Sequence, residues 1–458
     1  MAIKGGMKQM KKTVKVILCV VLCTGTAVGA MVLYSKNYTV QAATESIENT
    51  TGLVQASGRA LYDAQGKQLR LVGINASQLL LQEGWMSPFA LEPEKNEDGS
   101  YVKDKDGNLQ YPEFTEDEFR AGLQSNPNLK DYDLEELLNL YRGCFFTEED
   151  FRNIKEDLQM NAIRFPFYYL DILNEDLTLK NEEEAFSYLD WFISQAAKNE
   201  LYVVLDLHGA PGSQNGREHS GSPSGVAGLW ENQAYMDAVV QLWDFVSAHY
   251  TATAPELGKW IATYDILNEP EDGGRTTQRC WKLFDRIYDV IRENRDAHVV
   301  TMEGCWGFDA LPDPADYGWE NVQYEYHWYN WWSDVLPYDL YFAYNDLTNL
   351  GRDYDVPVLI GEFTFFEDRD AWAKGLELFD KRNYSWTVWS YKTTVTGWWT
   401  SSWGAYTCQL NLDTSTEERK CDVSKCTYEE FKAACEAVRT ENCVTSTLYD
   451  VLKIYNSK

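Results

Sequence analysis

Residues 261–270 read IATYDILNEP, and this stretch decides the fold. A short apolar run with β-branched and aromatic side chains, bounded by polar residues, is typical of a buried strand. Runs of the same kind recur along the chain, separated by longer amphipathic stretches, which is the pattern of a parallel sheet with helical crossovers. Eight runs are predicted as strands: Leu69–Asn75, Ala162–Phe167, Tyr202–His208, Ile261–Asn268, His298–Glu303, Val322–Trp328, Pro357–Phe363 and Trp386–Tyr391.

The intervening stretches have the apolar spacing of helices. The clearest are Glu182–Asn199, Tyr235–Tyr250 and Trp281–Arg292. This alternation predicts an α/β fold with a single (β/α)8 TIM barrel. An open doubly wound sheet is the alternative, but it normally begins with a glycine-rich nucleotide-binding turn, and residues 73–75 (GIN) do not form one. We therefore expect a closed barrel and no nucleotide.

Three segments lie outside this alternation. A hairpin is expected from Arg59 to Tyr62, through a turn at residues 64–67, and on from Leu69. An acidic insertion after the first strand, residues 85–153, is expected to be partly helical from Asp117 to Tyr141. A Cys-rich insertion, residues 408–443, precedes a last helix at about Thr447–Tyr455. The expected organisation is a signal peptide at residues 1–42 and one barrel domain at residues 43–458.

The first 42 residues have the order of a secretory signal. Five lysines between Lys4 and Lys15 precede an apolar run from Val16 to about Leu33, and residues 40–42 (VQA) form a small-residue cleavage pattern. We expect cleavage near Ala43 and a secreted protein. The alternative is an uncleaved anchor that holds the protein at the cell surface, since roughly 18 apolar residues can span a bilayer. Disulfides among the five cysteines from Cys408 to Cys443 fit an oxidising compartment, but their spacing decides no pairing.

Composition narrows the range of partners. The 458 residues include 41 Lys and Arg against 71 Asp and Glu, a formal net charge of −30, so the chain would repel a phosphate backbone. Nucleic acid is therefore not expected as a partner. The 17 Trp and 29 Tyr exceed the needs of a core, and aromatic rings of this kind serve as platforms for sugars. The Asp104, Asp106 and Asn108 spacing approaches that of a calcium loop, but the glycine and the closing glutamate are misplaced, so a turn is the better interpretation.

Functional side chains of a (β/α)8 barrel lie where strands end and loops begin. Glu269 and Glu362 each follow an apolar run directly. The fourth and seventh strands lie roughly opposite each other across the mouth, so we expect the two carboxylates to meet about 5 Å apart. The other polar or aromatic residues at predicted strand ends are Arg164, Asp206, His208, Asn268, Glu303, His327, Tyr329 and Trp389.

Two facing carboxylates are what the hydrolysis of a glycoside requires. One protonates the leaving oxygen, and the other attacks or stabilises the developing oxocarbenium centre. Their pKa values must differ, so we expect partial burial and a neighbouring charge to raise the pKa of one, and a cation to keep the other ionised. Arg164 and His208 are the candidate supports for Glu362.

The same residues stand in motifs that resemble glycoside hydrolase family 5 in clan A, and in particular its exo-β-1,3-glucanase-like members. The motifs, over about residues 53–400, are NAIRFPF (161–167), DLHGAPGSQNG (206–216), NEP (268–270), HWY (327–329), GEF (361–363) and WSYK (389–392). The resemblance implies retention through a covalent glycosyl-enzyme, with Glu269 as acid/base and Glu362 as nucleophile. It also implies that Arg164 and Tyr329 orient the nucleophile, that Asn268 bonds the sugar 2-hydroxyl and that Trp389 stacks under the ring. His208 and His327 match the remaining active-centre positions.

Other candidates follow from position alone. Trp306 and Trp398 follow strand ends and are expected to be sugar platforms. Asp206 is expected to brace the barrel, and Glu303 is either a substrate ligand or a structural carboxylate. His219, His249 and His298 are expected at the surface or at helix ends.

The sequence thus predicts a monomeric, secreted, retaining β-glycoside hydrolase that needs no cofactor and no metal. Its partner would be an oligo- or polysaccharide, and its substrate a β-linked glucan with β-1,3, mixed or β-1,4 linkage. A β-mannanase and a disaccharide-releasing exo-β-glycosidase remain alternatives among enzymes. A catalytically silent carbohydrate-binding or adhesion protein is the alternative from another class.

Overall fold

The structure is a computed structural model that describes residues 45–103, 107, 109–352, 354–395, 403–409 and 420–457. The expected signal peptide, Trp398 and the Asp104, Asp106 and Asn108 group lie outside the described residues. The chain divides into two compact units, one of residues 43–329 with 354–458 and one of residues 1–42 with 330–353. Helix α11 (Tyr338–Gly351) is the helix described in the smaller unit. The descriptions of the fold and of the site below concern the larger unit.

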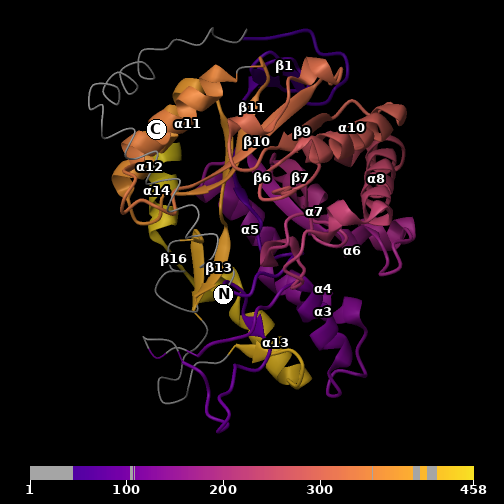
Figure 1. The fold of residues 1–458 in the computed structure, drawn as a ribbon, viewed down its shortest axis with the longest axis vertical. Coiled ribbons are helices and arrows are strands. Elements are labelled where there is room, and N and C mark those ends of the chain that lie inside the picture. Colours follow the sequence, from indigo (N-terminus) through magenta and orange to yellow (C-terminus); the bar gives the residue numbers. More distant parts are fainter. Residues whose placement is uncertain are drawn as a thin grey trace. The chain divides into compact units, whose positions relative to one another are not determined.

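Eight parallel strands close into a barrel, as the sequence predicts (Figure 1). Neighbouring strands around the ring are parallel at every step. The strands, in ring order, are β4 (Val72–Asn75), β6 (Ala162–Tyr168), β7 (Tyr202–Gly209), β8 (Ile261–Asp265), β9 (Val299–Glu303), β10 (Val322–Tyr329), β11 (Val358–Thr364) and β12 (Ser385–Val388). The carboxyl ends of all eight therefore meet at one mouth.

The first, fourth and eighth strands are shorter than predicted. The eighth ends at Val388 rather than at Tyr391. Local contacts account for the other two. The first predicted strand, Leu69–Asn75, is divided, because Gln68–Leu69 forms β3 and pairs with the hairpin strand β2. The fourth ends at Asp265 rather than at Asn268. Beyond it the amide of Asn268 donates to the carbonyl of Leu207 at 3.0 Å, so the chain is still held beside β7 while it leaves the barrel ladder.

The predicted helices are confirmed. α7 (Glu182–Lys198) is capped by Asn181, whose side chain accepts the Glu184 amide, and it buries Leu189, Phe192 and Ile193 against the barrel. The remaining long helices follow the same pattern of one buried face. They are α8 (Gln233–Ala248), α10 (Gln278–Glu293), α12 (Arg369–Arg382) and α14 (Thr447–Asn456).

The amino ends of the barrel strands are covered by the predicted hairpin. Its strands are β1 (Gln55–Ser57), β2 (Ala60–Tyr62) and β3 (Gln68–Leu69). Val54 and Leu61 from this segment pack in one buried cluster with the side chains at the starts of the barrel strands, among them Leu71, Ala162 and Leu359. This end of the barrel is therefore a hydrophobic floor, and the functional mouth lies at the other end.

The two insertions pack against each other. The first carries β5 (Phe89–Ala90), α3 (Glu116–Ser125), α4 (Leu134–Phe145) and α5 (Glu148–Arg152). In the second, β15 (Cys421–Asp422) pairs with β5, and α13 (Tyr428–Ala437) packs against α4. The rings of Phe89 and Phe431 lie 5.3 Å apart between centroids, which joins the cores of the two segments. The helical character expected from Asp117 to Tyr141 is present as two helices.

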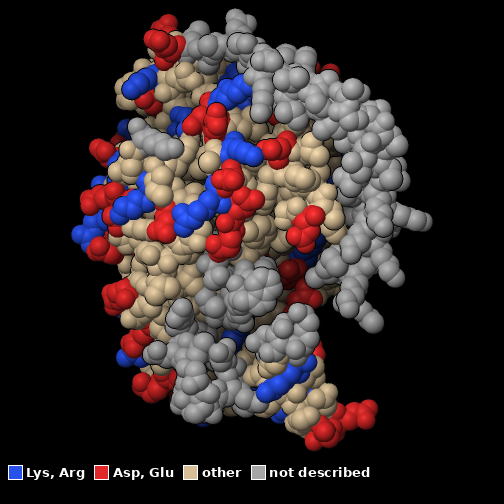
Figure 2. Space-filling model, turned by 90° about the vertical axis from the view of Figure 1, so that its left-hand side faces the viewer, with Lys and Arg blue, Asp and Glu red and all other residues tan. Residues whose placement is uncertain are grey.

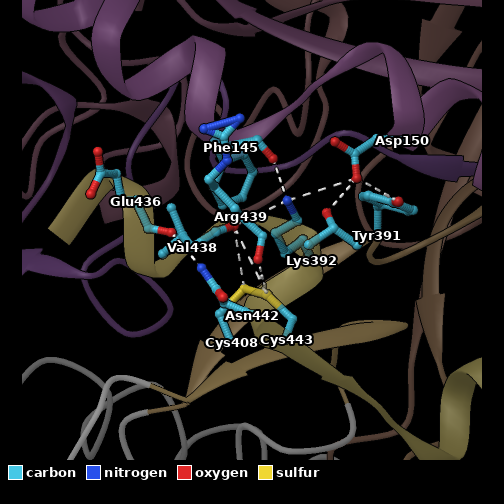
Figure 3. Close-up of a disulfide and its surroundings, with 11 residues drawn as sticks. Phe145, Asp150, Tyr391, Lys392, Cys408, Glu436, Val438, Arg439, Asn442 and Cys443 are labelled. Carbon is cyan, nitrogen blue, oxygen red and sulfur yellow. Dashed lines mark hydrogen bonds and ion pairs between the residues drawn. A yellow bond between two sulfur atoms is a disulfide. The ribbon is translucent and has the colours of Figure 1, made fainter. Parts of the chain in front are cut away.

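A third small sheet holds the end of the chain beside the barrel, with strands β13 (Lys392–Val395), β14 (Tyr406–Gln409) and β16 (Cys443–Thr445). A disulfide joins Cys408 to Cys443 across β14 and β16 (Figure 3). Beside it, the buried ammonium of Lys392 bonds the carbonyl of Val438 at 3.1 Å and also contacts the carbonyl of Phe145. Burial lowers the pKa of Lys392 to about 8. The lysine thus links the first insertion to the Cys-rich one.

Within the part of the chain that the structure describes, no helix has both the length and the apolar content needed to cross a bilayer.

Candidate active site

Two glutamates meet at the mouth of the barrel. Glu362 lies in β11, and Glu269 is the fourth residue after the end of β8. One oxygen of each carboxylate and one ring nitrogen of His327 all lie within 4.8 Å of one another. The sequence places these residues far apart, and the closed barrel brings them together as predicted.

Glu362 is held by two hydrogen-bond donors and one ion pair. Arg164 Nη1 lies 3.0 Å from its Oε1, and the Tyr329 hydroxyl donates to its Oε2 at 2.8 Å. His327 Nδ1 is 3.4 Å from the same Oε2. These contacts fix the carboxylate in one orientation, in line with the expected roles of Arg164 and Tyr329.

Arg164 lies at the centre of a buried charge cluster. Its guanidinium is within 3.2 Å of four carboxylates, those of Asp206, Asp265, Glu325 and Glu362. Burial alone would lower the pKa of Arg164, but the acids raise it well above its usual range. Arg164 therefore stays charged, and it also donates to the Asn268 side-chain oxygen at 2.8 Å. One cation thus positions Glu362 and Asn268 together.

The glycine before the nucleophile candidate follows from this cluster. A Cβ on Gly361 would lie 1.5 Å from Glu325 Oε1. Because Glu325 is fully buried and paired with Arg164, its oxygen cannot move aside. Only glycine leaves room there, which accounts for the first letter of the GEF motif.

The backbone of Glu269 is strained. Its φ is +42°, in the left-handed region that residues other than glycine rarely adopt. The Glu303 carboxylate accepts the Glu269 amide and so holds this conformation. Of the two interpretations left open for Glu303, this contact supports the structural carboxylate.

Both oxygens of the Glu269 side chain have a histidine beside them. His327 Nδ1 is 2.9 Å from Oε1, and His219 Nε2 is 2.8 Å from Oε2. Burial alone would raise the pKa of Glu269, but the charges and contacts of His219 and His327 hold it well below its usual range. The expectation that burial and a neighbouring charge raise the pKa of the acid/base candidate is therefore wrong for Glu269, because two cations outweigh burial.

Asn268 presents an unused donor to the site. Its carbonyl accepts from Gln214, and its side-chain oxygen accepts from Arg164. Its buried Nδ2 has no hydrogen-bond partner among the described residues. A buried amide without a partner is costly, and a substrate hydroxyl would satisfy it. The expected contact to the sugar 2-hydroxyl stays a prediction.

Trp389 belongs to an aromatic wall of the site. It packs with Met86 and Trp403, and with the partly buried Trp85 and Tyr329. Two of these residues come from the start of the first insertion, so this segment contributes directly to the site. The expected stacking of a sugar on Trp389 stays a prediction.

His208 does not support Glu362 as expected. Its Nδ1 lies 2.7 Å from Asp206, and its ring stacks on Trp389 at 5.5 Å between centroids. Asp206 in turn contacts Arg164 at 3.1 Å. His208 therefore packs against the aromatic wall. Asp206 contacts both His208 and Arg164 and so helps to hold them in place.

Of the two expected sugar platforms, the structure describes Trp306, and Trp398 lies outside the described residues. Trp306 is 46% exposed, and the Arg217 guanidinium lies over its ring at 5.3 Å from the centroid. An exposed indole beside the mouth is compatible with sugar stacking, which stays a prediction.

The three histidines expected at the surface or at helix ends are buried or partly buried, and each has a carboxylate partner. Of the three, His249 lies at a helix end, as the C-cap of α8. His249 lies 2.8 Å from Glu182, and His298 lies 2.5 Å from Asp296. His219 contacts Glu269, as described above. Sequence reasoning missed these pairs because the partners of His249 and His219 lie about 50 residues or more away in the chain.

Glu83 is a further residue that sequence reasoning missed. It is buried, it accepts from the Trp85 indole at 2.7 Å, and burial raises its pKa to about 8 even though His219 opposes the shift. The charge of Glu362 also acts on it. Its place two residues before Trp85, where the first insertion begins, is the signal that could have found it.

Among the described residues, one group of side chains could hold a metal ion, and it consists of Glu269, His327 and Glu362. A divalent cation there would lie beside Arg164 and beside two histidines that already neutralise Glu269. Repulsion between these charges opposes binding, so we assign no metal to the site.

Solved structures of other proteins share the fold. AoRut aligns with a TM-score of 0.52 at 18% identity, over 73% of this chain and 94% of its own. A rutinosidase from Aspergillus niger aligns with a TM-score of 0.51 at 16% identity, over 73% of this chain and 95% of its own. At these identities the likeness concerns the barrel alone.

Sequence relatives carry names from carbohydrate chemistry. A β-xylosidase of Phanerodontia chrysosporium is 31% identical over 278 residues, 54% of this chain and 56% of the relative. A probable glucan 1,3-β-glucosidase A of Neosartorya fischeri is 29% identical over 242 residues, 50% of this chain and 54% of the relative. The chain thus spans about half the length of the curated relatives it matches.

The model of one family matches most of the barrel. It is the cellulase model of glycosyl hydrolase family 5, and it matches residues 122–394. The match includes all six motifs and both glutamates at the mouth. The chain is therefore a member of glycoside hydrolase family 5.

Proposed function

We propose that this chain is a retaining β-glycoside hydrolase that cleaves a β-linked glucan. The observation that carries the proposal is the approach of the Glu269 and Glu362 carboxylates to within 4.8 Å. Carboxyl groups about 5–5.5 Å apart are typical of retaining glycosidases, whereas inverting ones leave room for a water at about 6.5–9.5 Å. A separation this short supports direct attack of one carboxylate on the anomeric carbon of the substrate.

The assignment of roles follows from the contacts. Glu362, oriented by Arg164 and Tyr329, attacks the anomeric carbon, and the bond from that carbon to the glycosidic oxygen breaks. The leaving oxygen takes a proton from Glu269. Water then attacks the glycosyl ester, Glu269 takes the proton of that water, and Glu362 is released as a carboxylate.

The substrate class rests on the relatives. Several are named glucan 1,3-β-glucosidases, and others are named probable glucan endo-1,6-β-glucosidases. A neutral β-glucan also suits a strongly acidic chain with an aromatic wall at its mouth. We further propose that the protein acts outside the cell, on the basis of the signal-like order of residues 1–42.

A second candidate is removal of short units from chain ends, as an exo-β-xylosidase or a disaccharide-releasing glycosidase. The residues Trp85 and Met86, from the first insertion, pack against Trp389 and favour it, since an inserted wall beside the sugar platform can close a groove into a pocket. The profile of products from a defined oligosaccharide separates the two candidates. Single short units indicate a pocket, and mixed lengths indicate a groove.

The test combines variants with stereochemistry. Glu362→Gln and Glu269→Gln should each lower turnover of the best substrate by orders of magnitude, with the fold intact by circular dichroism. The substrates to screen are β-1,3-glucan, mixed-linkage glucan, cellulose, mannan and aryl β-glycosides. Proton NMR of the first product should show the β-anomer. Glu256→Gln is the matched control, because the side chain of Glu256 is 82% exposed.

Three outcomes would contradict the proposal. Near-normal hydrolysis by Glu362→Gln would show that Glu362 is not the nucleophile. Release of the α-anomer would indicate inversion. Sugar binding by calorimetry without any product on the whole panel would instead favour a silent carbohydrate-binding protein.

A further inference from the structure

His219 is placed where the proton of the acid/base has to come from. It lies in the loop after β7, and its Nε2 is 2.8 Å from Glu269 Oε2. Although the two atoms are this close, Oε2 has no hydrogen bond of good geometry among the described residues, so the contact is an ion pair. Oε1 is already engaged by His327. Oε2 is therefore the oxygen that remains for the glycosidic oxygen.

The two histidines beside Glu269 differ in their surroundings. The His327 side chain is 1% exposed, and besides Glu269 it contacts Glu303, Glu325 and Glu362. Its charge is shared among four carboxylates beneath the mouth. The His219 side chain is 20% exposed, and the carboxylate it contacts is that of Glu269. Of the two, His219 has the access to solvent that a proton donor needs in order to be reloaded.

The loop that carries His219 is held firmly to Glu269. Asn215 Nδ2 donates to the Glu269 carbonyl at 3.2 Å and lies 3.0 Å from His219 Nε2, to which it can donate only when that nitrogen carries no proton. Within the loop, Ser213 and Ser220 bond each other through their hydroxyls at 2.6 Å, and the Gly216 amide donates to Ser213. The position of the imidazole relative to Glu269 is thus set by the backbone of both segments.

Charge from several elements acts on this pair. Glu218 on its own loop and Glu83 from the loop after β4 face His219, in addition to Glu269. Arg217, Glu271, Glu303, His327 and Tyr329 face Glu269. Burial alone would lower the pKa of His219, but Glu269 and the neighbouring acids raise it to about 10. At neutral pH the pair is therefore imidazolium and carboxylate.

A general acid that is ionised at rest needs a source for its proton. We propose, on the basis of the glycosidase function proposed above, that His219 is a positioning residue that stores the proton delivered by Glu269. As the bond to the leaving group breaks, the one proton on His219 Nε2 moves to Glu269 Oε2 and from there to the glycosidic oxygen, which leaves a neutral imidazole beside the Glu269 carboxylate. When water attacks the glycosyl ester, its proton returns through Glu269 to His219, so the cycle ends with the imidazolium restored.

The first test compares leaving groups. In His219→Gln the amide fills the same space but stores no proton, so cleavage of alkyl glycosides and glucan should fall about 100-fold, the lower end of the range for general acid catalysis. Cleavage of a dinitrophenyl glycoside needs little protonation and should change less than threefold, by roughly the effect of a surface substitution. External imidazole should restore part of the alkyl glycoside activity of His219→Ala.

The pH profile gives a second readout. Because the pKa of His219 is raised, the stored proton is present below that pKa and is lost as pH rises through it. The alkaline limb of kcat/KM reports this loss in the wild type, so His219→Gln should move that limb to lower pH. His249→Gln is the matched control, since His249 also lies between two carboxylates, Glu182 and Asp190, but away from the mouth. It should leave both the leaving-group dependence and the pH profile unchanged.

A third measurement does not depend on activity or on the stability of a His219 variant. Nitrogen NMR of labelled histidine should show that the His219 ring remains doubly protonated at pH 8 in the wild type and becomes neutral there in Glu269→Gln. Equal losses on good and poor leaving groups with an unmoved alkaline limb, or a neutral ring at pH 8 in the wild type, would overturn the inference. If the wild type hydrolyses no glycoside at all, the proposed function is wrong. The NMR result then still shows whether His219 and Glu269 form an ion pair.

Discussion

Tyr329 offers the cleanest test at the scale of one residue. Its hydroxyl donates to Glu362 Oε2 at 2.8 Å, and burial together with the charge of Glu362 raises the pKa of the phenol well above its usual range. It therefore remains a donor at any working pH. Tyr329→Phe removes one hydrogen bond to a charged group, worth about 1.5–3 kcal/mol, and should lower kcat/KM about 10- to 100-fold.

The control for this substitution is Tyr344→Phe, because Tyr344 is 61% exposed. It should leave the kinetics unchanged. Both variants should unfold at the temperature of the wild type within a few degrees. A normal kcat/KM for Tyr329→Phe would mean that the phenol does not help to orient the carboxylate.

Single residues also mark the limit of what the sequence could predict about the site. Glu269 and Glu362 could be found because each ends an apolar run at a barrel strand, and the barrel rule then brings them together. The pKa of Glu269 could not be predicted, because its sign depends on His219. That histidine lies in a loop without periodicity, and its partner is 50 residues away. Glu325 was missed for a different reason, since it stands inside an apolar strand and reads as part of it.

At the scale of elements, the Cys408–Cys443 disulfide secures the sheet of β13, β14 and β16. The bond closes a loop with a sequence separation of 35 residues. In the chain-entropy model such a loop is worth about 3–4 kcal/mol. The double variant Cys408→Ala/Cys443→Ala should therefore unfold at lower urea concentration than the wild type, by a free energy of that order.

Reductant supplies the control. It should lower the urea midpoint of the wild type toward that of the double variant and leave the double variant itself unchanged. Equal midpoints for the wild type with and without reductant would mean that the bond contributes no stability. Since β13 follows Trp389 by three residues, the double variant should also bind glucan more weakly than the wild type.

The strands and helices could be predicted where apolar residues recur with a regular period. The barrel strands and the helices α7, α8 and α10 follow from apolar runs and from stripes of 3.6 residues. The ends of the strands were less predictable, as β8 shows. Its apolar run continues to Leu267, but the chain must leave the ladder after Asp265 so that the backbone can turn at Glu269. The packing of the two insertions on each other depends on contacts between residues more than 300 positions apart, such as Phe89 with Phe431, which no local pattern contains.

At the scale of the whole molecule, the net charge of −30 should select among glycans. On the face drawn in Figure 2, acidic and basic side chains lie interspersed, so the excess of acid acts as a diffuse field there and not as one acidic patch. A polyanionic glucan should be repelled by this field. The dissociation constant of the Glu362→Gln variant for a carboxymethylated β-glucan should therefore exceed that for the neutral polymer at 10 mM salt, where charges act over roughly 30 Å.

Varying the salt concentration distinguishes electrostatic repulsion from steric exclusion. At about 0.15 M salt the screening length falls to about 8 Å, and the two dissociation constants should approach each other. The constant for the neutral polymer should not change, which serves as the control. A ratio of the two constants that is independent of salt would assign the difference to steric exclusion of the carboxymethyl groups.

The hairpin floor of the barrel has a practical consequence for joining this protein to others. Ser46 pairs with Lys67, so the described chain starts beside the hairpin that seals the amino ends of the strands. The Glu269 and Glu362 carboxylates lie at the opposite rim. A partner protein or a solid support coupled in place of the segment before Glu45 would thus be tethered behind the enzyme, with the opening for polymer chains facing away from the attachment.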